Sequence, residues 1–115
     1  MFPYENLEVY KIAYATNKII YNLIKGNKTI PGYAKDQLGR ASLSIMLNIA
    51  EGSAKFSNKD RRNFFVTARG STFECAALVS FLHEEIEIPA NVFDEVNKAY
   101  DSLSRMLFTM IKNLD

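Results

Sequence analysis

Apolar residues recur at spacings of three and four along most of the chain, and no segment alternates apolar and polar residues as a half-buried strand does. Stretches rich in glycine, proline and polar residues interrupt this pattern at 26–32, 52–57 and 88–91. The pattern predicts four helices, over residues 5–25, 34–52, 58–86 and 90–113. Gly26 and Gly52 stand where glycines end helices. Ser57 and Asp60 resemble a capping box at the start of the third helix.

The predicted second helix carries two apolar faces, whereas the last helix carries one. In the last helix a single stripe runs through Val92, Val96, Ala99, Leu103, Met106 and Met110. In the second helix one side holds Leu38, Ala41, Ile45 and Ile49, and the roughly opposite side holds Leu43, Met46, Leu47, Ala50 and Ala54. A helix in a small bundle buries one face, so the second face needs a partner, and a second copy of the chain is the economical one.

The first and third helices repeat this excess of apolar surface. Between Phe73 and Leu82 the only charged residue is Glu74, which is typical of a helix buried nearly all round. On the first helix Tyr10, Tyr14 and Tyr21 form a stripe that suits a partly wet interface. The sequence predicts one domain over residues 1–115, an all-α, up-down antiparallel four-helix bundle that associates with copies of itself. The alternative interpretation places all these residues in one core.

The composition limits the cellular compartments and the classes of partner that we expect for the protein. The 115 residues are 48% hydrophobic, with a formal net charge of +1, so the overall charge does not itself indicate a polyanion partner. The lone cysteine, Cys75, excludes an intrachain disulfide. The first residues lack a signal-peptide pattern, and no run approaches the ~20 apolar residues of a membrane span. We therefore expect a cytoplasmic protein with no membrane partner.

The sequence holds no constellation typical of an enzyme. His83 is the only histidine, and Ser80 stands where a paired Glu-x-x-His motif needs glutamate. Zinc sites need several His or Cys ligands, and the chain has one of each. A surface histidine near a helix end is the simpler interpretation. We predict no catalytic residues, no metal and no cofactor.

Charge is unevenly distributed along the chain. From Ala34 to Arg69 seven basic residues stand against three acidic ones, and from Phe73 to Asp101 seven acidic residues stand against one basic. The turn between the second and third helices should therefore be a basic end of the bundle. Such an end either holds nucleic-acid phosphates or is an ordinary solvated turn. The candidate nucleic-acid-binding residues are Lys35, Lys55, Lys59, Arg61 and Arg62.

Polar residues on the second helix form a second candidate group. Arg40, Asn48 and Glu51 flank its two apolar faces, and buried polar groups must be paired. Glu74, alone in an apolar stretch, is a plausible partner for Arg40. We interpret Arg40, Asn48, Glu51 and Glu74 as a structural polar network, with a ligand site as the alternative.

One stretch of the predicted second helix resembles a known family. The motif is Arg40-Ala41-x-x-Ser44-Ile45-x-x-Asn48-Ile49-Ala50-Glu51-Gly52. It is similar to the bacterial four-helix-bundle proteins encoded in 23S rRNA intervening sequences, which include the accessory variability determinant of diversity-generating retroelements. Further similarities lie in the other helices, at Leu7-x-Val9-Tyr10, Gly70-Ser71 and Leu103-x-x-Met106-Leu107.

The resemblance implies an up-down bundle assembled as a homopentameric ring, with no catalytic residues. It implies RNA or DNA and a reverse transcriptase as partners, since the retroelement members bind both. Those members are strongly basic, whereas this chain is nearly neutral. Two hypotheses follow: a non-enzymatic, oligomeric adaptor that binds nucleic acid, and a self-assembling scaffold or protein-interaction module without a nucleic-acid role.

Overall fold

Four α-helices follow one another along the chain, after a single 3-10 turn. The computed structural model describes residues 1–86 and 88–114, and within these ranges it contains helices and no strand. The elements are η1 (Pro3–Asn6), α1 (Glu8–Gly26), α2 (Gly32–Ala54), α3 (Asn58–Glu85) and α4 (Ala90–Lys112). The prediction of an all-helical chain with four helices is confirmed. Glu87, which was counted in the acidic stretch, and Asp115 lie outside the described residues.

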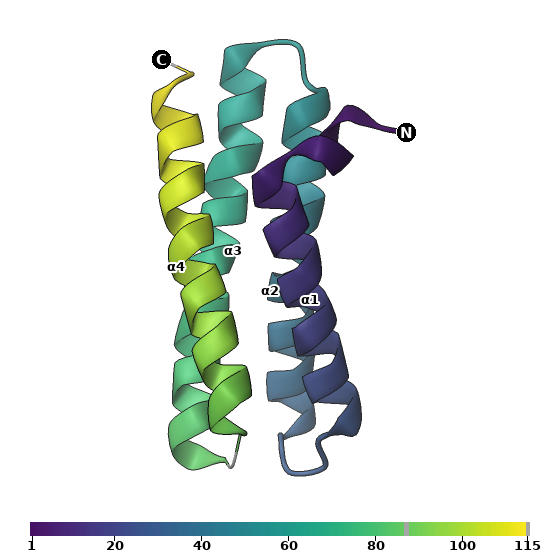
Figure 1. Cartoon of the computed structure of the whole chain (residues 1–115), viewed down its shortest axis with the longest axis vertical. Coiled ribbons are helices and arrows are strands. Elements are labelled where there is room, and N and C mark those ends of the chain that lie inside the picture. Colours follow the sequence, from purple (N-terminus) through teal and green to yellow (C-terminus); the bar gives the residue numbers. More distant parts are fainter. Residues whose placement is uncertain (87, 115) are drawn as a thin grey trace.

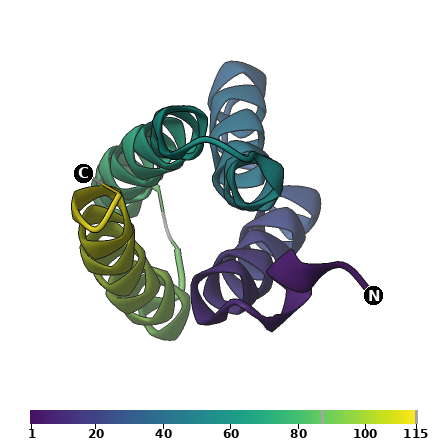
Figure 2. The same cartoon turned by 90° about the horizontal axis from the view of Figure 1, so that it is seen from above.

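The helices stand side by side and consecutive ones run in opposite directions (Figure 1). Seen from above, α1 and α2 form one side of the molecule, and α3 and α4 form the other (Figure 2). The contact between α2 and α3 is the most extensive, and α4 packs on α1 to close the arrangement. The molecule measures 44 × 26 × 23 Å, so its length follows the helices. No helix in the described part is both long and apolar enough to cross a bilayer.

Each helix contributes one buried stripe to a common core. The largest side chains that are completely enclosed include Ile20, Leu38, Ile45, Ile49, Leu82, Leu103 and Leu107. On α2 the buried positions follow the 3–4 spacing of the sequence, as an amphipathic helix requires. On α3 the core face contains Phe65 and Val79. Phe64 and Leu78, each one position away around the helix, are only half-buried.

At the helix ends one predicted cap is confirmed, and two predicted helix boundaries differ from the structure. Ser57 caps α3, its hydroxyl accepting the Asp60 amide at 3.1 Å, so the predicted cap is confirmed. The first helix begins at Glu8, because Pro3–Asn6 form their own 3-10 turn. Gly52 does not end α2, which continues to Ala54.

Gly52 instead allows α2 and α3 to approach closely. Gly52 is buried, and a Cβ atom there would lie 2.7 Å from Cε1 of Phe65 and 3.0 Å from Cβ of Phe64. No glycine of the described chain has a positive φ, so Gly52 is not needed for its backbone conformation. Its lack of a side chain makes room for the phenylalanines of α3.

Candidate functional site

The turn between α2 and α3 is a basic end of the bundle. Lys55 is the residue after α2, and Lys59, Arg61 and Arg62 lie in the first turns of α3. Four of the five predicted nucleic-acid-binding residues therefore meet at one end of the molecule, where the chain reverses (Figure 1). Only Asp60 interrupts this run of cations within the turn.

The fifth predicted residue, Lys35, lies at the other end. It is in the first turn of α2, twenty residues before Lys55, which corresponds to about 30 Å along a helix. There it lines a groove of about 460 Å³ between α1 and α2, together with Tyr21 and Asp36. The grouping of Lys35 with the other four was wrong. Lys35 and Lys55 stand at opposite ends of α2, and the length of this helix keeps them apart.

Side-chain contacts hold the basic turn in one shape. Arg61 Nε donates to the Lys55 carbonyl oxygen at 2.6 Å, which satisfies a carbonyl just past the end of α2. The Lys55 amide donates to the Gly52 carbonyl at 3.2 Å. The Lys55 ammonium lies 5.0 Å from the centre of the Phe64 ring, within cation–π range. Lys59 is exposed.

Phe56 stands at the tip of this turn, between Lys55 and the Ser57 cap. Its side chain is 99% exposed, the highest value among the large apolar residues of the described chain. An aromatic ring that is wholly exposed on a turn fixed by hydrogen bonds is available to a partner without rearrangement. Basic and aromatic groups therefore share one end of the bundle.

A polar seam runs between α2 and α3. The Ser44 and Ser71 hydroxyls lie 2.9 Å apart, and Asn48 Nδ2 donates to the Ser44 carbonyl and hydroxyl oxygens at 2.8 and 2.9 Å. Further along, Gln37 Nε2 donates to the Glu74 carboxylate. These groups are satisfied by one another and link the two helices.

Only two members of the predicted polar network belong to this seam. Asn48 and Glu74 do, but Glu74 takes Gln37 as its partner where we expected Arg40. Arg40 lines the groove between α1 and α2, and Glu51 is exposed.

A groove between α3 and α4 holds Arg69, for which the sequence predicted no role beyond its charge. The Arg69 guanidinium lies 4.8 Å from the centre of the Phe73 ring and 5.5 Å from that of Phe108. Arg69 Nε donates to the Ser104 carbonyl at 3.1 Å. The groove has a volume of about 450 Å³ and is lined by Val66, Arg69, Gly70, Phe73, Phe108 and Ile111. The spacing of four between Arg69 and Phe73 was the signal available in the sequence.

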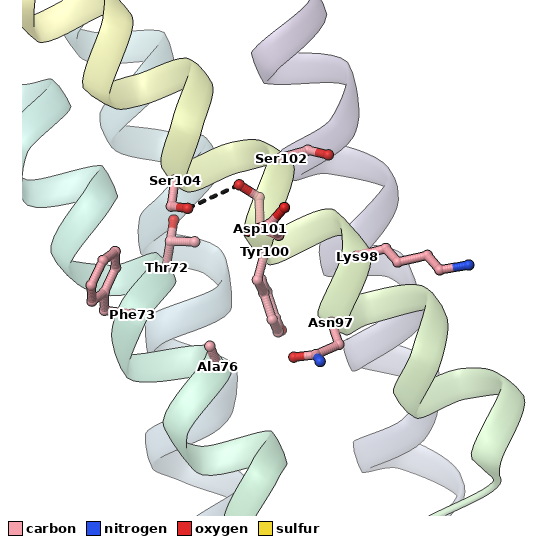
Figure 3. A pocket seen from close by; sticks show the side chains of 9 residues that line it. All are labelled: Thr72, Phe73, Ala76, Asn97, Lys98, Tyr100, Asp101, Ser102 and Ser104. Atoms are coloured by element: carbon pink, nitrogen blue, oxygen red, sulfur yellow. Dashed lines mark hydrogen bonds between the residues drawn. The ribbon is translucent and has the colours of Figure 1, made fainter.

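A second groove between α3 and α4 has a volume of about 710 Å³. Its lining residues are Thr72, Phe73, Ala76, Asn97, Lys98, Tyr100, Asp101, Ser102 and Ser104 (Figure 3). None is a histidine or a cysteine, and Ser104 is engaged, since its hydroxyl donates to the Asp101 carbonyl at 2.9 Å. Neither Ser102 nor Ser104 is hydrogen-bonded to the Lys98 ammonium or to the Asp101 carboxylate, which line the same groove.

Cys75 and Tyr100 face each other in the core. Burial raises the pKa of the Cys75 thiol to about 12, and burial likewise raises the pKa of the Tyr100 hydroxyl. A reactive cysteine has a lowered pKa and is accessible, so this thiol has the character of a structural residue.

His83 is half-buried, where we expected a surface histidine. Its ring stacks on Phe93 of α4, with centres 3.9 Å apart and planes at 9°. Within residues 1–86 and 88–114 no three His, Cys, Asp or Glu residues gather as metal ligands.

Comparison with known proteins gives a family and a fold. The family model described as 23S rRNA-intervening sequence protein matches residues 5–109. The chain is similar to the crystal structure of a protein with unknown function from the S23 ribosomal protein family of Bacteroides thetaiotaomicron. The identity is 23% and the TM-score 0.84, over 90% of this chain and 98% of that one, which shows a shared fold. No curated protein matches the chain.

Proposed function

Because the chain belongs to the family of 23S rRNA-intervening sequence proteins, we propose that it is a non-enzymatic adaptor that assembles with copies of itself. The resemblance noted in the sequence makes a five-membered ring the expected assembly. The role of such a protein is to present one surface several times, so that weak contacts add up.

Exposed apolar side chains on two different sides of the bundle carry this proposal. On the side of α1 and α2 they are Tyr14, Tyr21, Leu43 and Leu47, and on the side of α3 and α4 they are Val66, Phe73, Phe81 and Phe108. The two sides face in different directions (Figure 2). Two different patches favour a head-to-tail contact, in which one patch of each copy meets the other patch of the next. Repetition of such a contact closes a ring when the rotation allows it.

The mass of the protein in solution tests this proposal. Light scattering coupled to size exclusion, at micromolar concentration, should give a multiple of the 13.1 kDa chain mass, five-fold for the expected ring. The double variant Leu43→Ser, Leu47→Ser should elute as a single chain. Tyr33→Ser, which removes an exposed aromatic at the N-terminal end of α2, is the matched control. A wild-type protein with the mass of one chain would refute self-association.

A second candidate function is binding of RNA or DNA at the basic end. Lys55, Lys59, Arg61 and Arg62 lie within eight residues, beside a fully exposed Phe56. Proteins that bind single strands combine such cations, which contact phosphates, with aromatic rings on which bases stack. A ring would repeat this end in every copy.

Fluorescence anisotropy with labelled RNA at low salt tests this second function. The variant Lys55→Glu, Lys59→Glu should bind at least about tenfold more weakly, because phosphate contacts supply most of such affinity. The control variant Lys28→Glu, Lys98→Glu changes the net charge by the same amount, on exposed residues outside the basic end. It should lose much less affinity than Lys55→Glu, Lys59→Glu, because only the general effect of net charge weakens its binding. Equal weakening of the two variants, or no salt-dependent binding at all, would leave the scaffold role alone.

A further inference from the structure

Arg69 is held in place but its charge is only partly satisfied within its own chain. Two aromatic rings and one carbonyl oxygen contact the guanidinium, and no carboxylate of a described residue forms an ion pair with it. A guanidinium offers five N–H donors in a planar fork that matches a carboxylate. The α3–α4 groove around Arg69 thus combines an apolar wall with a cation whose orientation is fixed.

The outer strip of α2 has the complementary composition. We define this strip as Leu43, Leu47 and Glu51, which follow one another at spacing four and so share one face of the helix. The two leucines are 45% and 44% exposed, and Glu51 is exposed as well. The strip therefore offers two apolar side chains that match the apolar wall of the groove, followed by a carboxylate that matches its cation.

The contacts between α2 and α3 give the relative heights of the strip and the groove. Ser44 lies opposite Ser71, and Gly52 lies opposite Phe64 and Phe65, so higher numbers on α2 match lower numbers on α3. On this register Leu43 is level with Phe73, and Leu47 is level with Arg69. Glu51 is about one turn, or about 5 Å, beyond Arg69.

The directions of the two side chains close this gap. Side chains on a helix lean toward its N-terminus, so the side chain of Glu51 leans toward the level of Leu47. Because α3 is antiparallel to α2, the side chain of Arg69 leans the opposite way, toward the level of Glu51. A rotation about an axis parallel to the bundle leaves every height unchanged. In a ring built on such an axis, the strip of one copy and the groove of the next therefore meet in register.

We propose that the α3–α4 groove receives the outer strip of α2 from a second copy, with Glu51 of that copy paired to Arg69. This pairing rests on the proposed self-association and adds its contact residues. Leu43 and Leu47 fill the space between Phe73, Phe108 and Val66, and the ion pair fixes the register of the interface. The groove thus distinguishes copies of this chain from other apolar partners.

Charge reversal and its rescue test the pairing in the full-length chain. Arg69→Glu and Glu51→Arg should each weaken association at least about 30-fold, measured as loss of the oligomer in light scattering, because each places like charges together. The double variant Arg69→Glu, Glu51→Arg should restore the oligomer. Circular dichroism melts of all three variants establish that the helices still form. Glu51 is exposed, so its variant reports on association even if Arg69→Glu affects folding.

Arg105→Glu combined with Glu51→Arg is the matched control. Arg105 is an exposed arginine of α4 that pairs with Asp101 at 3.2 Å, so its reversal should not rescue Glu51→Arg. An oligomeric wild type whose mass neither single reversal changes would overturn the pairing and leave self-association standing. A folded double variant that stays a single chain would overturn it too. A wild type with the mass of one chain would overturn both proposals.

Discussion

The two apolar faces of α2 have almost the same chemistry and opposite surroundings. Ile45 and Ile49 on the inner face are 2% and 0% exposed, whereas Leu43 and Leu47 on the outer face are 45% and 44% exposed. Both pairs are branched aliphatic residues separated by one helical turn. The inner pair is enclosed in the common core of its own chain. The outer pair has no such cover. The inner face therefore stabilises the fold, and the outer face is available to a partner.

The same contrast recurs on α3. Cys75 and Val79 point into the core, while Phe73 and Phe81 are more than half exposed on the outside. Two adjacent helices thus each expose a second apolar face, and typical monomers expose less contiguous apolar surface than this. Folding and assembly should therefore respond separately to substitutions on the two faces.

The largest expected effect comes from the inner face. Ile49→Ala should lower the free energy of unfolding by about 2–5 kcal/mol, because it removes three buried carbons and leaves a cavity in a fully enclosed site. Urea unfolding followed by circular dichroism measures this loss, at a protein concentration low enough to dissociate any assembly. A loss below about 0.5 kcal/mol would mean that the inner face is no better packed than the surface.

Adding a carbon on the inner face should cost somewhat less. Gly52→Ala should destabilise the protein by about 1–3 kcal/mol, because the new Cβ would lie 3.0 Å from Cβ of Phe64, an atom that no rotamer change can move. Gly39→Ala is the matched control: its Cβ would meet only Cδ1 of Ile24, at 3.6 Å. The control should gain about 0.5–1 kcal/mol from helix propensity. Equal changes in thermal unfolding for both variants would contradict the close approach at Gly52.

These two positions show how far the sequence could predict the fold. The 3–4 spacing of Leu38, Ala41, Ile45 and Ile49 was enough to identify the inner face of α2, because helical periodicity is a local property. The role of Gly52 was not predictable, because the same glycine suits a helix end and a close contact. The choice between them depends on Phe64 and Phe65, which another helix brings into place.

The sequence could likewise predict only part of the candidate site. Lys55, Lys59, Arg61 and Arg62 could be grouped from the sequence, because eight consecutive residues around a turn remain close in any fold. Lys35 does not belong with them, and the helix predicted over residues 34–52 was enough to place it a helix length away from that turn. The contact between Arg69 and Phe108 could not be predicted. Phe108 is 39 positions away in the sequence and becomes a neighbour only when α4 packs on α3.

A pH titration extends the comparison to the inner face of α3. Burial raises the pKa of Cys75 from its ordinary 9.0 to about 12, so above pH 9 the unfolded chain loses the thiol proton before the folded chain does. The unfolded state then binds fewer protons, and stability falls as the pH rises from 9 toward 12. The loss assigned to this thiol is at most about 1.4 kcal/mol per pH unit.

Cys75→Ala isolates this contribution from the other groups that titrate. Urea unfolding at pH 7, 9 and 10.5 should show a shallower decline above pH 9 for the variant than for wild type, whatever their difference at pH 7. Tyr100 stays in both proteins, and burial, the largest cause of its raised pKa, keeps its hydroxyl protonated in both folded states at these pH values. Parallel declines would show that the thiol is accessible to solvent in the folded protein.

The smallest effect on folding is expected on the outer face. Leu47→Ser should lower the free energy of unfolding of the dissociated chain by only about 1 kcal/mol, because its side chain is already 44% exposed and loses only its remaining contacts and some helix propensity. Its effect on assembly should be much larger. Any assembly that buries Leu47 makes the wild-type melting temperature rise with protein concentration, since association stabilises only the folded chain. For Leu47→Ser that dependence should disappear, while the melting temperature at high dilution falls by only a few degrees. A variant that loses several kcal/mol at high dilution would place Leu47 in the fold itself, and the distinction between the two faces of α2 would fail.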